Sequence, residues 1–412
     1  MSFKQKILEK SDSYNYYKDN YSSLKKQLKD KNNLIKEYES LIFNFEQRYD
    51  KSDSLKKDIK DLNIAYILLA FPVHSQTFVV SEIKWLMENG YNVCVFRHID
   101  AGKTVELDFD VENYQFGNIL QLELLLVEHD IDFVHAHFAD FVCNNFTYPV
   151  CKKLKIPFTV FAHAYDIFRD DLIKKSRIDE MSNSEYCKAI FTLSEFHRNY
   201  LIERNVNPDK IVITKQASSY NVHELTKREG KIRNIVSISR FVEKKGLDVL
   251  IDAAKLLEDE DFVFEIYGFG DLQDELQKRI DDLKCTNISI KGELQPDEVE
   301  SKLMESDLLA SPCKVAANGD MDGFPTVIFE AMGCGIPFVT TAVSAIPEIV
   351  TDGINGFITD PENPEKLAEK IREVSNLSAD ELFEIRKQAQ EDVQRISSVD
   401  NTMNRFIDTI KS

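Results

Sequence analysis

Short runs of apolar residues alternate with longer amphipathic segments from Asn63 onward. The short runs are apolar at successive positions, as in strands buried on both faces, and the longer segments repeat their apolar residues every three or four positions, as in helices. This alternation is typical of doubly wound parallel sheets, so we expect an α/β fold. The predicted strands are Asn63–Ala70, Asn92–Phe96, Phe133–His135, Phe158–Ala162, Ala189–Leu193, Ile211–Thr214, Asn234–Ser239, Phe262–Tyr267, Ile288–Ile290, Leu308–Ser311 and Phe338–Thr341.

A polar stretch without periodic apolar positions, Lys215–Lys231, separates the two series of predicted strands. Such a stretch is typical of a connection between domains. We therefore expect a first α/β domain over residues 62–215, a second over 216–395, and a C-terminal helix over 396–412 that crosses back to the first domain.

Residues 1–61 have a different pattern and contain neither proline nor glycine. Apolar residues, tyrosines and two lysines recur at alternating spacings of three and four from Ile7 to Tyr49, which is about six heptads in phase. A straight helix would drift by ~20° per heptad against such a seam, so the pattern predicts a coiled-coil helix. The segment would then mediate homo-oligomerisation. The alternatives are a helical arm folded on its own body and a binding site for another protein.

The distribution of charge limits the partners of the protein. The 412 residues carry a formal net charge of −19, which divides into +3 for residues 1–61 and −22 for the rest. General nucleic-acid binding depends on basic surface, so we exclude it. An anionic ligand approaching the acidic body would need local basic residues, which gives weight to any lysine or arginine beside a candidate site.

Cysteines and apolar runs indicate the compartment. The seven cysteines are scattered and form no CxxC pair, which favours reduced thiols over disulfides or a zinc site. No apolar run approaches the ~20 residues of a membrane span, and the first residues lack the order of a signal peptide. We expect a cytoplasmic protein, and the basic, tyrosine-containing residues 1–61 leave open a peripheral position at the inner membrane face.

The stretch Asp322–Pro337 has residues typical of the start and the end of a short helix. Gly323 permits a tight bend and Pro325 suits the first helical position, while Gly335 suits the end. The spacing predicts a helix from about Pro325 to Gly333.

Two carboxylates flank the start of this helix. Asp322 lies in the preceding loop, and Glu330, on the second turn, leans back toward Thr326 because helical side chains tilt toward the N-terminus. The helix N-terminus favours anionic oxygens, and a carboxylate can accept hydrogen bonds from two neighbouring sugar hydroxyls. Phosphates and diols together indicate a nucleotide-sugar.

The acid, seven intervening residues and glutamate stand in a Gly-Phe-Pro…Glu-Ala-Met context. In this the chain resembles the family-four retaining glycosyltransferases of the GT-B fold. The resemblance covers about residues 62–410 and implies two facing Rossmann-like domains with a cleft between them. It also implies metal-independent sugar transfer with retention at the anomeric carbon, with Asp322 at the transferred sugar and Gly323, Phe324, Pro325, Thr326 and Glu330 in donor binding.

The second domain carries further residues of this resemblance. In Arg240-Phe241-Val242-Glu243-Lys244-Lys245-Gly246 it assigns Arg240 and Lys245 to the donor diphosphate, which suits a guanidinium fork and a mobile ammonium. Lys244 is expected to be solvated. The resemblance also places Gly268 and Gly270 at the nucleotide pocket. Gln273 stands where a dinucleotide fingerprint would have its third glycine, which argues against a dehydrogenase.

The first domain contributes histidines at predicted strand ends. His163, in His163-Ala164-Tyr165-Asp166, matches the family histidine beside the donor sugar. His135 and His137 share one face of a strand, where a metal site is conceivable. With no third ligand evident and the resemblance implying metal-independent chemistry, we expect no metal. His137 and Asp166 are assigned to acceptor or phosphate contacts.

A loop after the first strand departs from the common family pattern. Ser75, Gln76 and Thr77 stand where many members have a pair of glycines, and this resembles the exopolysaccharide and colanic-acid subgroup. The loop is expected to contact either the acceptor or the donor phosphate. Its position at a carboxyl strand end is where open α/β sheets bind ligands.

The resulting hypothesis is an enzyme that transfers a hexosyl group from a nucleotide-sugar to a glycan or lipid-linked acceptor in cell-surface polysaccharide synthesis. No cofactor is expected, since the nucleotide-sugar is a co-substrate. Two alternatives remain, a GT-B sugar phosphorylase that uses inorganic phosphate and a non-catalytic coiled-coil scaffold that keeps the fold.

Overall fold

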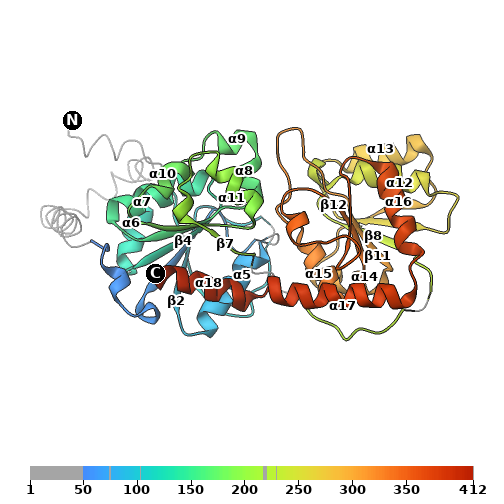
Figure 1. The fold of residues 1–412 in the computed structure, drawn as a ribbon. Helices are drawn as coiled ribbons and strands as arrows, with labels where there is room; N and C mark the ends of the chain where they lie inside the picture. Colours follow the sequence, from blue (N-terminus) through green and yellow to red (C-terminus); the bar gives the residue numbers. More distant parts are fainter. Residues whose placement is uncertain (1–49, 74–75, 103, 217–219, 229, 412) are drawn as a thin grey trace, which may run out of the picture.

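The computed structural model describes residues 50–73, 76–102, 104–216, 220–228 and 230–411. Two twisted sheets stand side by side, each with helices against it (Figure 1). Their strand orders are β3-β2-β1-β4-β5-β6-β7 and β10-β9-β8-β11-β12-β13, and the strand pairs of both sheets are parallel. The predicted pair of doubly wound α/β domains is confirmed.

The N-terminal domain is built from the first sheet and seven short helices of the described residues. Its elements are β1 Asn63–Leu68, α5 Thr77–Glu88, β2 Asn92–Arg97, β3 Glu112–Gln115, α6 Ile119–Glu128, β4 Phe133–His137, α7 Tyr148–Leu154, β5 Phe158–Phe161, α8 Ala164–Phe168, α9 Asp170–Ile173, α10 Ile178–Ser182, β6 Cys187–Thr192, α11 Glu195–Ile202 and β7 Ile211–Ile213.

The C-terminal domain follows the same plan. Its elements are β8 Asn234–Ile238, α12 Leu247–Leu256, β9 Val263–Tyr267, α13 Gln273–Leu283, β10 Ile288–Gly292, α14 Pro296–Glu305, β11 Leu308–Ser311, α15 Thr326–Cys334, β12 Phe338–Thr341, β13 Phe357–Thr359, α16 Pro364–Ser375 and α17 Ala379–Ile396, and the final helix is α18 Val399–Lys411.

Two strands have no counterpart among those predicted from the sequence. β3 is an edge strand whose residues are mostly exposed, and β13 has only three residues. Both lack the continuous apolar run that marks a strand buried on two faces. The apolar pattern therefore predicts the buried strands of each sheet and misses one edge of each.

Alternate residues of β1 serve the two faces of the first sheet. Ala65 and Ile67 belong to the core on one side, and Ile64 and Tyr66 to the core on the other. The second of these cores is completed by α18, from the end of the chain. Met403, Phe406, Ile407 and Ile410 of that helix are buried in it, after α17 has crossed the C-terminal domain (Figure 1).

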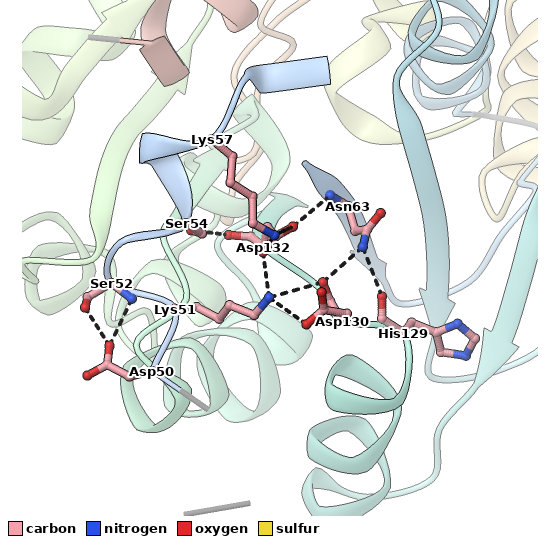
Figure 2. Close-up of polar contacts among 9 residues, drawn as sticks. All are labelled: Asp50, Lys51, Ser52, Ser54, Lys57, Asn63, His129, Asp130 and Asp132. Carbon is pink, nitrogen blue, oxygen red and sulfur yellow. Dashed lines mark hydrogen bonds and ion pairs between the residues drawn. The ribbon is translucent and has the colours of Figure 1, made fainter. Parts of the chain in front are cut away.

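Residues 50–61 are attached to the amino-terminal edge of the first sheet (Figure 2). The Lys51 and Lys57 ammonium groups lie 2.6 and 2.8 Å from Oδ1 of Asp132, and the Ser54 hydroxyl donates to its carbonyl oxygen at 2.8 Å. The backbone N–H of Asn63 donates to the same carboxylate at 3.2 Å. Burial opposes ionisation of Asp132, but the two lysines prevail and lower its pKa.

The prediction of one helix over residues 1–61 is wrong for its last part. Residues 50–61 contain two short 3-10 turns, Ser54–Lys56 and Ile59–Asp61, instead of a continuous helix. The reason is that this segment binds Asp132 and buries Ile59 and Leu62 against the domain. The heptad seam from Ile7 to Tyr49 lies outside the described residues.

The two domains contact each other beside the cleft. The Glu348 carboxylate of the C-terminal domain accepts from the backbone N–H groups of Glu195 and Phe196, at 3.0 and 2.8 Å, at the start of α11. Nε2 of His197 lies 2.9 Å from the Ser344 hydroxyl oxygen. A carboxylate at a helix N-terminus meets unpaired N–H groups, so this contact stabilises the approach of the two domains.

Candidate active site

A cavity of about 530 Å³ lies between the domains. Its walls come from loops at the carboxyl ends of parallel strands in both sheets, where open α/β sheets bind ligands. From the N-terminal domain it is lined by residues that include Gln76, His137, Phe138, Asp140, His163 and Tyr165, and from the C-terminal domain by Ser239, Arg240, Lys244, Lys245 and Asp322 to Val327.

Asp322 is a buried carboxylate held between two lysines. Nζ of Lys245 lies 2.5 Å from its Oδ2, and Nζ of Lys244 lies 3.2 Å from its Oδ1. Burial alone would favour the neutral acid, but the two ammonium groups outweigh it and lower the pKa of Asp322 far below its usual range. Asp322 is therefore ionised and fixes both lysines at the cavity wall.

The expectation that Lys244 is solvated is wrong. Its side chain is buried and pairs with Asp320 at 2.9 Å as well as with Asp322. Burial disfavours its charge, yet the two carboxylates raise its pKa overall. The acids that pull Lys244 inward lie more than 70 positions away in the sequence, and for this reason the local Glu-Lys-Lys pattern misleads.

Arg240 is an exposed cation at the cavity. It follows β8, and in the part of the chain that the structure describes its guanidinium has no hydrogen-bond or ion-pair partner. An arginine fork left unpaired beside a cavity is suited to bidentate recognition of phosphate.

Gly268 and Gly270 do not line the cavity but position the Arg240 loop. Gly268 has a φ of +143°, and a Cβ there would come within 1.8 Å of the carbonyl oxygen of Ser239. At Gly270 a Cβ would approach the carbonyl oxygen of Phe241 to 2.5 Å. Both glycines thus allow the β9–α13 loop to pack against the backbone on either side of Arg240.

The N-terminus of α15 opens on the cavity. The helix begins at Thr326, one residue later than predicted, with Pro325 as the residue before it, and Gly335 ends the helix with a φ of +64°. Thr326, in the first turn, is exposed and lines the cavity, and Phe324 packs against Phe329 with ring centroids 4.2 Å apart. Gly323 passes close to the other domain, since a Cβ would lie 2.5 Å from Cδ1 of Leu193.

His163 faces these groups from the N-terminal domain. It follows β5, precedes α8 and is 5% exposed. Burial and the neighbouring His137 lower its pKa well below the usual range, so the imidazole is neutral. The structure brings His163, Arg240, Lys245 and Asp322 together around one cavity.

Comparison with known proteins agrees with this arrangement. Residues 222–392 match the family model described as glycosyl transferases group 1, and residues 75–215 match glycosyltransferase family 4. An uncharacterized glycosyltransferase of Methanocaldococcus jannaschii, MJ1178, is 30% identical over 70% of this chain and 77% of its own length. The chain is a family-four glycosyltransferase.

Two further comparisons agree with this family and this fold. The amylovoran biosynthesis glycosyltransferase AmsK of Erwinia amylovora is 25% identical over 77% of this chain and 92% of its own length. HepE of Anabaena, solved in complex with UDP, has a TM-score of 0.70 at 17% identity and covers 85% of this chain and 99% of its own. Among the described helices of the glycosyltransferase, none is long and apolar enough to cross a membrane.

Of the residues that the sequence analysis assigned to acceptor or phosphate contacts in the glycosyltransferase, Asp166 and Thr77 do not line the cavity. The Asp166 carboxylate is buried and accepts from the backbone N–H groups of Ala139 and His163, at 2.7 and 2.8 Å. It therefore supports the loop that carries His163. Gln76 lines the cavity, Thr77 begins α5 on the exposed side, and Ser75 lies outside the described residues.

The sequence did not single out two acids of the glycosyltransferase that the structure places near the histidines. Asp140 lines the cavity, and burial raises its pKa to about 6. Glu82, on α5, is 2% exposed and contacts His137. A signal existed for Glu82, because it occupies the buried face of α5 with Val79, Ile83 and Leu86, where an acid is unexpected.

Glu330 lies one turn beyond Thr326 on α15, half-buried and outside the cavity lining. Burial, reinforced by the nearby Glu300, raises its pKa to about 7. An acid with a raised pKa stabilises the fold while protonated, and this contribution is lost as the pH rises through the folded-state value. The fraction of Glu330 present as a carboxylate, the form that accepts most strongly from hydroxyls, therefore rises as the pH increases through about 7.

Nucleoside diphosphate affinity is accordingly expected to rise between pH 6 and pH 8 in the glycosyltransferase. The rise should be smaller in Glu330→Gln. The pH dependence that remains in this variant measures the contribution from titration of the ligand phosphate. Calorimetric titration with UDP, GDP and ADP at both pH values measures the difference. Glu300→Gln is the matched control, since removing this neighbouring charge should lower the pKa of Glu330 and shift the rise to lower pH. If affinity changes equally with pH in wild type and Glu330→Gln, Glu330 does not take part in nucleotide binding.

Proposed function

We propose that the protein transfers a hexosyl group from a nucleotide-sugar to a glycan or lipid-linked acceptor in cell-surface polysaccharide synthesis, with retention and without a metal ion. The observation that carries this proposal is the guanidinium of Arg240, which has no partner among the described residues and lines one cavity with Lys245, the N-terminus of α15 and His163. The relative AmsK, named for amylovoran biosynthesis, and the UDP complex of HepE support a nucleotide-sugar donor and a polysaccharide product.

The proposed reaction proceeds on one face of the sugar. The bond from the anomeric carbon to the donor phosphate oxygen breaks, and the acceptor hydroxyl oxygen bonds to that carbon on the same side. The acceptor proton passes to the departing diphosphate. Arg240, Lys245 and the α15 N-terminus stabilise the negative charge that develops on the leaving group, which is where preorganised charge contributes most to the rate. Asp322 and His163 hold the sugar, and Glu330 holds the ribose.

The cations also bear on metal dependence. Arg240, Lys244 and Lys245 place positive charge at the expected diphosphate position, which is the role a divalent cation has in other phosphate-transfer sites. We therefore propose that a chelator leaves transfer unchanged.

A panel of UDP-, GDP- and ADP-sugars, with release of nucleoside diphosphate as the readout, tests the proposed function. We expect one donor to stand out, undiminished turnover in EDTA, and a product whose anomeric proton has the donor configuration by NMR. Inverted product, or a covalent glycosyl adduct on Asp322, would contradict the proposed mechanism. Undiminished turnover with inorganic phosphate in place of the acceptor would indicate a phosphorylase, and binding of no nucleotide would indicate a scaffold.

A further inference from the structure

A buried chain of hydrogen bonds runs from the cavity wall into the N-terminal domain. Nε2 of His163 lies 3.0 Å from Nδ1 of His137, and Nε2 of His137 lies 2.9 Å from Oε2 of Glu82. The three residues are 5%, 4% and 2% exposed. Only the outermost, His163, has a role in the reaction proposed above.

The fold holds both imidazoles in fixed planes. His137 ends β4 and His163 follows β5, its neighbour in the sheet, while Glu82 comes from α5. The ring of Phe161 stacks on His163, with centroids 4.5 Å apart and an interplanar angle of 14°. Phe78 and Phe138 pack around His163 at 5.0 and 4.4 Å. Neither ring can turn without disturbing this aromatic packing.

The order of partners determines which nitrogen of each ring carries the proton. With Glu82 as a carboxylate, which only accepts, Nε2 of His137 donates to it at 2.9 Å. The lone pair of His137 is then on Nδ1, which leaves Nε2 of His163, 3.0 Å away, as the donor between the two rings. Since burial keeps His163 neutral, its Nδ1 is the acceptor that meets the N3 backbone N–H in the capping box of α8.

Oε2 of Glu82 has further polar neighbours, whereas Oε1 has no hydrogen-bond partner among the described residues. The Tyr66 hydroxyl donates to the same Oε2 at 3.3 Å. His135 is more distant, with Nε2 3.8 Å from Oε2, and its Nδ1 lies 2.7 Å from the Thr159 hydroxyl oxygen. Glu82 is a third potential metal ligand that the sequence did not show beside His135 and His137, since one ligand atom from each of these residues lies within 4.8 Å of the others. The 2.9 Å contact between His137 and Glu82 has the length of an N–H···O hydrogen bond.

We propose that Glu82 and His137 are positioning residues for sugar transfer. The Glu82 carboxylate fixes His137 with its proton on Nε2, and His137 fixes His163 in the same tautomer, so that the His163 ring, with Nδ1 as its acceptor, is held in one orientation against the transferred sugar. We call Glu82, His137 and His163 the relay. This inference rests on the proposed function, in which His163 holds that sugar. A buried carboxylate that sets the tautomer of an imidazole can affect turnover strongly without contacting substrate.

NMR of protein labelled with ¹⁵N-histidine tests the relay directly. In the wild-type chain at pH 7, His137 and His163 are both expected to carry the proton on Nε2, with signals assigned by their loss in His137→Phe and His163→Asn. In Glu82→Met the acceptor is gone, so His137 should move its proton to Nδ1 to donate to His163. His163 should then be protonated on Nδ1.

The matched variant is Glu82→Gln, whose amide oxygen can still accept from His137. It should keep both tautomers and most of the turnover. With the best donor of the panel above, Glu82→Met should lower kcat by about 10- to 100-fold, the size of effect seen when a supporting residue or a reacting group is displaced. The KM for the nucleotide-sugar should change less, because the diphosphate contacts are intact.

Several outcomes would overturn the relay. A wild-type spectrum with Nδ1–H on either histidine does so without any variant. Unchanged tautomers in Glu82→Met, or switched tautomers with unchanged kcat, also contradict it. Because the spectra need no donor, failure of the relay and failure of the proposed function can be told apart.

Discussion

Arg240→Ala is expected to weaken nucleoside diphosphate binding by about tenfold or more. A hydrogen bond to a charged group contributes about 1.5–3 kcal/mol, and about 1.4 kcal/mol corresponds to a factor of ten in affinity. Because the guanidinium is exposed at the cavity and has no partner in the described part of the chain, its removal should leave the melting temperature unchanged. Calorimetric titration with UDP, GDP and ADP measures the loss.

Two variants make the Arg240 experiment specific. Arg240→Lys keeps the charge but loses the planar fork, so it should recover only part of the affinity. Arg279→Ala removes another arginine, paired with Asp252 on the outer surface, and should bind nucleotide as the wild type does. If Arg240→Ala and Arg279→Ala have the same affinity, the phosphate site lies elsewhere.

Asp322→Asn should reduce turnover by about 100-fold and also lower stability. The amide no longer balances Lys244 and Lys245, so the leaving group loses its fixed cations, and removing one such preorganised group costs about 10²–10³ in rate. Breaking a buried ion pair by removing one partner costs about 3–5 kcal/mol. Steady-state kinetics and thermal unfolding of the same preparation separate the two effects.

The difference in stability between wild type and Asp322→Asn should depend on pH. A carboxylate whose pKa is lowered in the folded state stabilises the fold above its unfolded value, and the contribution disappears as the pH falls. Wild type and Asp322→Asn should thus differ most at neutral pH and converge in strong acid. Asp320→Asn is the control, since it removes a pairing partner of Lys244 but leaves Asp322 in place. Equal kinetic losses in the two variants would mean that Asp322 has no special place.

The sequence predicted the buried strands and the residues at their carboxyl ends, because apolar runs and turn residues are local signals. Arg240, Lys245, Asp322 and His163 belong to loops that follow such strands, and the cavity brings them together. Lys244 was misjudged, since the two acids that bury it come from another loop.

The relay also could not be predicted from local sequence patterns. The contact between Glu82 and His137 joins residues 55 positions apart on a helix and a strand. Periodicity places Glu82 on the inner face of its helix but cannot identify the imidazole it meets there. The apolar face of α5 nevertheless contained the clue, since a buried acid requires a partner.

The attachment of residues 50–61 determines at which end of the N-terminal domain the described chain begins. Asp132 precedes β4 and Asn63 begins β1, so the contacts of Figure 2 lie at the pole of the N-terminal domain farthest from the carboxyl ends that line the cavity. Asp50, where the described chain begins, therefore lies at this pole and away from the mouth of the cleft. A shortened chain should begin at Asp50, because a start at Asp61 would strip Asp132 of both lysines that balance its buried charge.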